Sequence, residues 1–111
     1  MRQPSFAEQA AATGYAEAVP HMPHEQARWA EALYKEAAVY DELLAKALQE
    51  RDEAKAQRDI LAYKEADYKA QRMFDNGNKV VSHLYGLVRD TNARLNGYKF
   101  STDGAYKEEN R

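Results

Sequence analysis

One stretch without glycine or proline decides the fold, and it runs from residue 24 to residue 76: HEQARWAEALYKEAAVYDELLAKALQERDEAKAQRDILAYKEADYKAQRMFDN. It is dense in Ala, Leu, Glu, Lys, Gln and Arg, the residues with the highest helix propensities. A continuous helix of this length would measure roughly 75–80 Å. Helices in globular proteins average about 11–12 residues, so we expect a long helix that needs a partner along much of its length.

Two stripes at seven-residue spacing run along this stretch. The first consists of Leu33, Tyr40, Ala47, Ala54, Leu61 and Tyr68. The second begins with Ala30, Ala37 and Leu44 and continues with Arg51, Arg58 and Glu65. Two adjacent apolar rows form the seam of a coiled coil. The first half of the stretch therefore offers a seam, whereas the second half pairs an apolar row with a charged row.

The middle of the stretch, residues 49–59, is polar apart from Ala54 and Ala56. A helix that is polar all round is solvent-bridging or is held by its own side-chain pairs. We expect one continuous helix from His24 to Asn76. The alternative is a break near residues 49–53 that folds the stretch into a hairpin.

A turn is predicted at Asp75-Asn76-Gly77-Asn78, because Asn and Gly tolerate the positive φ of a helix C-cap. A second helix with Asn78 as its N-cap would follow and end at Asn96-Gly97. A β-hairpin around the Asn-Gly pair is the alternative. The apolar residues of the second helix should pack on the end of the first. The residues concerned are Val80, Leu84, Leu87 and Leu95 on one side and Leu61, Tyr68 and Phe74 on the other.

The chain thus divides into three expected parts. Residues 1–23 form a leader, in which Ser5 and Glu8 have capping-box spacing and predict a short helix to Thr13, stopped by Gly14. Residues 15–20 are expected to form a loop, and Pro23 suits the first turn of the long helix. Residues 24–97 form the helical hairpin, and residues 98–111 form a tail in which Tyr98 and Phe100 could pack back on the helices.

The expected fold class is all-α: a long helix plus a shorter antiparallel helix, a helical hairpin or coiled coil that is oligomeric. The shorter helix would leave the N-terminal half of the long helix uncovered. The expected protein interface therefore consists of Trp29, Leu33, Ala37, Tyr40, Leu44 and Ala47. A homo-oligomer or a helical protein partner would cover it.

Composition limits the functional classes. The 111 residues contain no cysteine, which excludes disulfides and thiolate metal sites. No apolar run approaches a membrane span, and the N-terminus lacks a signal-peptide pattern. A cytoplasmic protein without membrane attachment is therefore expected. Residues 1–53 hold 5 Lys or Arg and 10 Asp or Glu, a net −5, whereas residues 54–111 hold 11 and 8, a net +3.

Catalytic signatures are missing from the sequence. It has no phosphate-binding loop, no G-x-G-x-x-G, no H-E-x-x-H and no G-x-S-x-G. The acids at 25, 31, 36 and 42 lack the Glu-x-x-His pattern of helical di-metal sites. His21 and His24 lie three residues apart with Glu25 adjacent, a spacing that could ligate a metal, but the sequence offers no clear third ligand. We expect no enzyme, no cofactor and no metal site.

The basic C-terminal half raises a nucleic-acid alternative. Aromatic residues interleaved with cations bind single strands by stacking and by contacts to phosphate. The candidate residues are Lys64, Lys69, Arg72, Lys79, Arg89, Arg94, Tyr63 and Tyr68. They would form one positive surface if the second helix folds back beside the end of the first. Acidic residues in the same region would repel phosphate.

A short pattern in the second helix resembles a known family. Lys79-Val80, Leu84, Leu87 and Arg94, followed by an aromatic residue and Lys99, are similar to the C-terminal signature of the recombination mediators of T-even-like bacteriophages. The resemblance covers about twenty residues. It implies a small helical protein that oligomerises through its C-terminal segment, assembles as a ring and loads a recombinase onto single-stranded DNA. The chain departs from the basic character of that family, because its net charge is −2.

The sequence therefore predicts a non-enzymatic helical assembly or adaptor protein that acts through self-association or partner binding. A phage or mobile-element origin is expected, which would place it in the host cell cytoplasm. The alternative is a recombination mediator that binds single-stranded nucleic acid.

Overall fold

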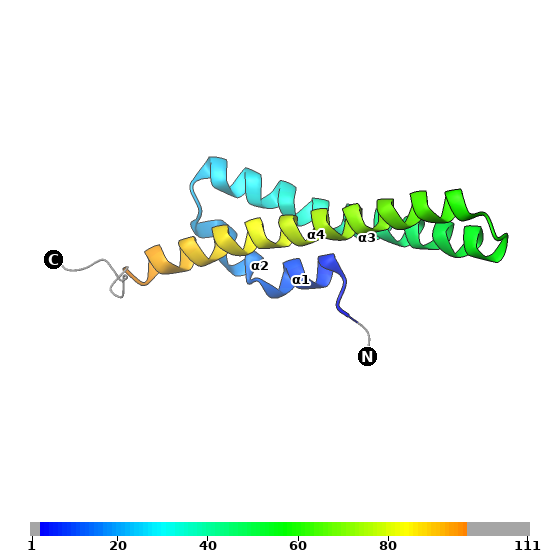
Figure 1. Ribbon diagram of the computed structural model, residues 1–111. Coiled ribbons are helices and arrows are strands. Elements are labelled where there is room, and N and C mark those ends of the chain that lie inside the picture. The colour runs from blue at the N-terminus through cyan, green and yellow to red at the C-terminus, as the bar shows by residue number, and fades with distance from the viewer. Residues whose placement is uncertain (1–2, 98–111) are drawn as a thin grey trace.

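The computed structural model describes residues 3–97, which fold into α-helices and one short 3-10 helix and contain no strand. The elements are α1 (Phe6–Ala12), α2 (Tyr15–Ala18), η1 (Val19–His21), α3 (His24–Ala56) and α4 (Ile60–Leu95). Two long antiparallel helices, α3 and α4, give the molecule the shape of a rod (Figure 1), with extents of 65 × 27 × 25 Å. The predicted all-α class is confirmed. Within the described residues, no helix combines the length and the apolar character that a membrane crossing requires.

The chain reverses direction at residues 57–59. Helix α3 ends at Ala56, Arg58 adopts a positive φ of 57°, and the Asp59 side chain accepts a hydrogen bond of 3.1 Å from the backbone N–H of Ala62. The expected continuous helix to Asn76 is therefore wrong. The alternative hairpin is correct in kind, but its break lies beyond the proposed residues 49–53. Asp59 as an N-cap satisfies an otherwise free N–H of α4 and fixes the position of the break.

The predicted turn at Asn76-Gly77-Asn78 is also wrong, because all three residues lie inside α4. Neither the β-hairpin nor a helix starting at Asn78 forms, and α4, with 36 residues, is longer than α3, with 33. Gly77 is buried where the Phe6 ring of α1 meets α4, and a Cβ at this position would overlap that ring. The glycine serves close packing between helices.

The heptad stripes of residues 30–54 face α4. Ala30, Leu33, Ala37, Ala47 and Ala54 are buried in the seam between the two helices. Knobs at seven-residue spacing keep one side of a long helix against its partner. The partner along the whole length of α3 is therefore the same chain.

Opposite α3, the buried positions of α4 also follow helical spacing. They are Ala66, Ala70, Gly77, Val80, Leu84, Val88 and Thr91. The predicted packing of the C-terminal apolar residues on Leu61, Tyr68 and Phe74 is wrong, because all of them lie on one helix. Leu61, Tyr68, Phe74 and Leu95 are exposed.

The N-terminal segment completes the core. The capping box is present as predicted: the Ser5 hydroxyl accepts from the Glu8 N–H, and the Glu8 carboxylate accepts from the Ser5 N–H. Helix α1 ends before Gly14, which has a φ of 88°. The expected loop at residues 15–20 is replaced by α2 and η1. Residues Phe6, Ala10, Ala18 and Met22 join the same core cluster as Leu33 and Leu84. The tail expected at residues 98–111 lies outside the described residues.

The start of α1 is tied to α3 by one carboxylate. The backbone N–H groups of Phe6 and Ala7 donate to the two carboxylate oxygens of Asp41, at 2.7 and 2.9 Å. These N–H groups have no partner within α1, because the first turn of a helix leaves its donors free. The negative charge also suits the positive end of the helix dipole. Asp41 is thus a cap supplied from another helix.

Replacing Asp41 with alanine should lower the free energy of unfolding by about 0.5–2 kcal/mol, the usual cost of losing a helix cap. Chemical denaturation followed by circular dichroism measures the change. Glu42→Ala is the matched control, because the Glu42 side chain is exposed and forms no ion pair with another helix among residues 3–97. Equal stability of the two variants would contradict the capping role of Asp41.

Candidate interaction surface

The rod has two unlike halves. Helices α1 and α2 lie against only that half of the α3–α4 pair which is away from the 57–59 turn (Figure 1). We call this three-layered half the body, and we call the two-helix part formed by residues 45–73 the arm. The body buries large side chains, including Phe6, Leu33 and Leu84. The arm has only alanines as its fully buried residues: Ala47, Ala54, Ala66 and Ala70.

Alanine seams bring two helices close together but bury little apolar area for each residue. Because the hydrophobic contribution is roughly proportional to the apolar area buried, the arm gains less from burial than the body. The rest of the stability of the arm comes from strong helix propensity and from side-chain pairs between the two helices. The arm is therefore the part of the rod that gains most from additional cover.

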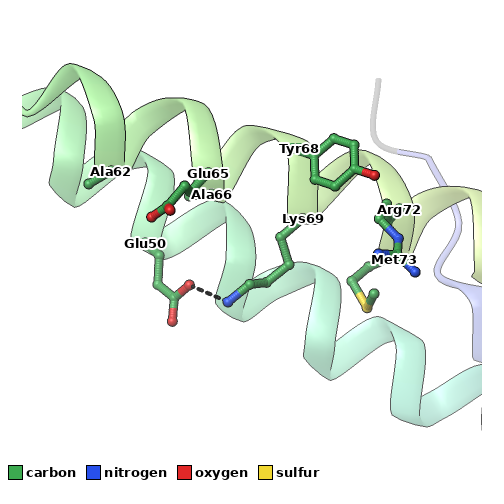
Figure 2. A pocket seen from close by; sticks show the side chains of 8 residues that line it. All are labelled: Glu50, Ala62, Glu65, Ala66, Tyr68, Lys69, Arg72 and Met73. Atoms are coloured by element: carbon green, nitrogen blue, oxygen red, sulfur yellow. Dashed lines mark hydrogen bonds and ion pairs between the residues drawn. The ribbon is translucent and has the colours of Figure 1, made fainter.

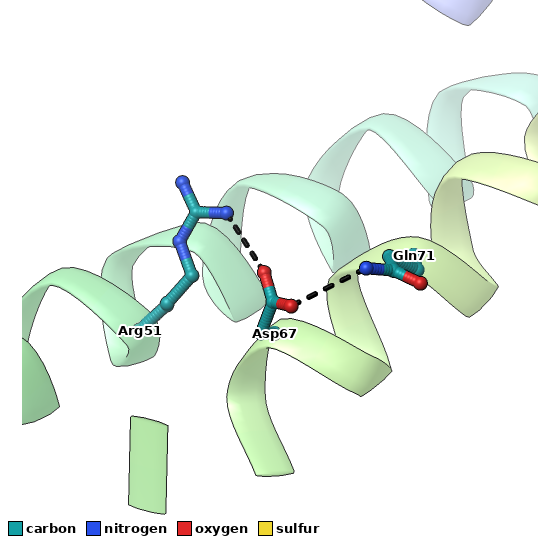
Figure 3. A network of polar contacts seen from close by, with 3 residues as sticks. All are labelled: Arg51, Asp67 and Gln71. Carbon is teal, nitrogen blue, oxygen red and sulfur yellow. Dashed lines mark hydrogen bonds and ion pairs between the residues drawn. The ribbon is translucent and has the colours of Figure 1, made fainter. Parts of the chain in front are cut away.

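One ion pair crosses the arm on the side that also carries α1. Arg51 lies 3.1 Å from a carboxylate oxygen of Asp67, whose other oxygen accepts from the Gln71 side chain at 3.3 Å (Figure 3). The hydrogen bond to Asp67 raises the pKa of Arg51 above its ordinary value, so the guanidinium remains charged. Arg51 belongs to the charged row seen in the sequence, and it is the member of that row that links the two helices.

The opposite side of the arm is a groove between α3 and α4 that no other helix of residues 3–97 covers. We call it the open groove, and Figure 2 shows it from close by. Lys69 lies 3.4 Å from Glu50 of α3 and bridges the two helices. The residues that line the groove are Glu50, Ala62, Glu65, Ala66, Tyr68, Lys69, Arg72 and Met73. Tyr68 is 64% exposed, and the Arg72 guanidinium lies 5.9 Å from the centre of its ring.

Two exposed leucines extend the open groove. Seven residues are nearly two helical turns, so positions i and i+7 share a flank. Leu43 therefore shares the flank of Glu50, and Leu61, which is 77% exposed, shares the flank of Tyr68. An aromatic ring, two leucines and several charges thus lie along one uncovered face. Such a mixture of exposed apolar and charged side chains is typical of a protein-binding surface.

The structure places most of the predicted interface residues inside the molecule. Leu33, Ala37 and Ala47 are buried against the chain's own α4, and Tyr40 and Leu44 are half-buried. The expectation that these residues lack cover within their own chain is wrong. The seam was recognised correctly, but its partner is α4.

Trp29 is the exception among the predicted interface residues. It is 52% exposed, and its ring centre lies 6.3 Å from that of His83. Leu61 and Tyr68 were assigned to the seam by the sequence pattern, yet they lie on the open face. The break at residues 57–59 resets the helical phase, so a heptad register does not carry across it.

The predicted nucleic-acid residues all lie on α4: Tyr63, Lys64, Tyr68, Lys69, Arg72, Lys79, Arg89 and Arg94. Lys64 and Arg94 are separated by about 45 Å along the helix axis. The sequence predicts a second helix that folds back beside the end of the first and so gathers these residues. This does not occur, because all of them lie on one helix. Lys69 is paired with Glu50, and Arg89 lies 3.5 Å from Asp90. Only Tyr68, Lys69 and Arg72 line the open groove together.

Metal-binding groups do not converge. Within residues 3–97, no group of three or more His, Asp or Glu side chains has an arrangement that could hold a metal ion. His21 ends η1, His24 is the first residue of α3, and His83 of α4 lies beside Trp29 of α3.

Comparisons of the chain with models of protein families, with curated proteins and with solved structures give no match.

Proposed function

We propose that the protein is a helical assembly or adaptor protein without catalytic activity, which acts by binding helices along the open groove of its arm. The single observation that carries the proposal is the uncovered face of a two-helix arm whose own seam is built of alanine. A third or fourth helix laid into this groove would bury Leu43, Leu61 and Tyr68 and turn the arm into a bundle. The body needs no such addition, because α1 already provides a third layer there.

The ion pairs of the arm are consistent with this role. Both Arg51–Asp67 and Lys69–Glu50 are at least partly exposed, and exposed pairs contribute about 0–1 kcal/mol each. They fix the register of the two helices without replacing the apolar burial that the arm lacks. A helical partner with an apolar stripe and compatible charges would supply that burial. Self-association provides such a partner directly.

Multi-angle light scattering at micromolar concentration should give a mass above that of the monomer. Tyr68→Ala should weaken this association by roughly tenfold or more, as is usual for a central aromatic residue of an interface. Tyr85→Ala is the matched control, because Tyr85 is 53% exposed but lies on the side of α4 that carries α1. A stable, fully helical monomer would refute self-association and leave a heterologous helix as the proposed partner.

The nucleic-acid alternative is favoured by one observation, the Tyr68 ring with Arg72 and Lys69 beside it. It requires that a labelled single-stranded oligonucleotide binds, and that binding weakens steeply as salt rises, because bound cations release counterions from the phosphates. Binding at low salt that weakens steeply as salt rises and is lost in Arg72→Glu would favour the mediator. If the oligonucleotide does not bind even at low salt, the assembly proposal stands alone.

A further inference from the structure

The open groove carries charges of opposite sign at matched positions. Glu65 and Arg72 are exposed and lie on one flank of α4, seven residues and about 10 Å apart. Figure 2 shows Tyr68 and Lys69 between them. Neither Glu65 nor Arg72 forms an ion pair within the part of the chain that the structure describes. Their separation is too large for them to pair with each other on one helix.

From this pattern we infer that the partner in the open groove is a second copy of the same chain, packed antiparallel across a two-fold axis that passes midway between Glu65 and Arg72. The inference rests on the proposed function and specifies its partner and register. A two-fold interface must be self-complementary, so that each contact occurs twice. An antiparallel copy centred on this axis places Glu65 of each chain opposite Arg72 of the other. Both unpaired charges of the groove are thereby paired twice.

The same axis also matches the exposed leucines. Lys69 of α4 pairs with Glu50 of α3, so these two residues lie at the same level of the arm. Because the helices are antiparallel, Leu43, seven residues before Glu50, lies at the level of residue 76, seven residues after Lys69. Leu61 lies four residues before Glu65. Because the axis places Glu65 opposite Arg72 of the second copy, Leu61 lies opposite the position four residues after that Arg72. That position is again residue 76. Each Leu61 thus meets Leu43 of the other copy.

The centre of the proposed interface is compatible with its charges. Tyr68 of each copy lies next to the axis, where two aromatic rings can pack against each other at a distance between helix axes of about 8–10 Å. The two Lys69 side chains also lie near the axis, but each is paired with its own Glu50 at 3.4 Å. Their charges are therefore compensated, and the arms of the two copies form a four-helix bundle.

Charge reversal with mixing tests this register. In Glu65→Arg both facing pairs become Arg with Arg, and in Arg72→Glu both become Glu with Glu, so each variant alone should dissociate with a Kd raised roughly tenfold or more. An equimolar mixture of the two variants restores both opposite-sign pairs in a heterodimer. Light scattering should therefore show two species of lower mass that recover the wild-type mass when combined. The double variant, with both residues exchanged, should associate like the wild type.

The control is Lys64→Glu, which changes the net charge as much as Arg72→Glu does. Lys64 is the residue before Glu65 and therefore lies on a different flank of α4. It should leave the mass unchanged, and circular dichroism should show full helicity for every variant. An oligomeric wild type whose mass is unaffected by the single reversals, or a mixture that fails to reassociate, overturns this register while self-association stands. A monomeric wild type overturns both this inference and the self-association on which it rests.

Discussion

Leu84→Ala should lower the free energy of unfolding by about 2–5 kcal/mol, the range for truncating a fully buried leucine. Leu84 is 0% exposed and lies in the core cluster with Phe6, Leu33 and Val88. The substitution removes apolar contacts and leaves a cavity between α1, α3 and α4 that rigid helices cannot fill by moving together. Urea denaturation monitored by circular dichroism measures the change.

The matched control for this truncation is Leu95→Ala at the end of the same helix. Leu95 is exposed, so its loss should change stability by about 0.5 kcal/mol or less, as for most surface positions. Both leucines lie in the apolar pattern of the second half of the chain, and only burial distinguishes them. Similar destabilisation by the two substitutions would contradict the packing of α4 on the body.

Gly77→Ala should destabilise the protein by about 1–3 kcal/mol, although alanine is the better helix former. A Cβ at position 77 overlaps the Phe6 ring, and Phe6 is held in place because its backbone N–H is bonded to Asp41. Helix α1 would have to shift away from α4 to make room. Denaturation curves, together with faster amide hydrogen exchange in α1, would show this loss of docking.

Gly86 offers a matched control in the same helix. A Cβ there meets nothing within 4 Å, so Gly86→Ala should stabilise the protein by up to about 1 kcal/mol through helix propensity alone. The effect at Gly77 should also change sign in a Phe6→Ala background, because the overlapping ring is gone. Phe6→Ala by itself should cost about 3–5 kcal/mol. A destabilising Gly77→Ala in that background would exclude the ring as the cause.

The sequence by itself determined the features that depend on local chemistry and on helical period. High helix propensity predicted the all-α class, and the capping box at Ser5 and Glu8 correctly predicted the start of α1. The heptad spacing of residues 30–54 correctly identified the seam face of α3. These signals depend on residues within one or two turns of each other, so no knowledge of distant contacts is required to interpret them.

Only the tertiary structure decided where the chain turns and what covers each face. Gln57-Arg58-Asp59 contains no glycine, and Asn76-Gly77-Asn78 has the stronger local turn signal, yet the chain reverses at the former. Turning at residue 58 pairs the alanine rows at 47, 54, 66 and 70 and brings Leu84 into the core beside Leu33. That gain from burial over two long helices outweighs the weak turn preference of three residues.

The role of Gly77 and the position of the open groove have the same cause. Gly77 is required by Phe6, which precedes it by more than seventy positions in the sequence and meets it only after the chain has folded. Leu61 and Tyr68 are left uncovered because the break at residues 57–59 shifts the helical phase of α4 relative to α3. A periodic pattern predicts which residues share a face of one helix, but the partner of that face depends on how the helices are connected and packed.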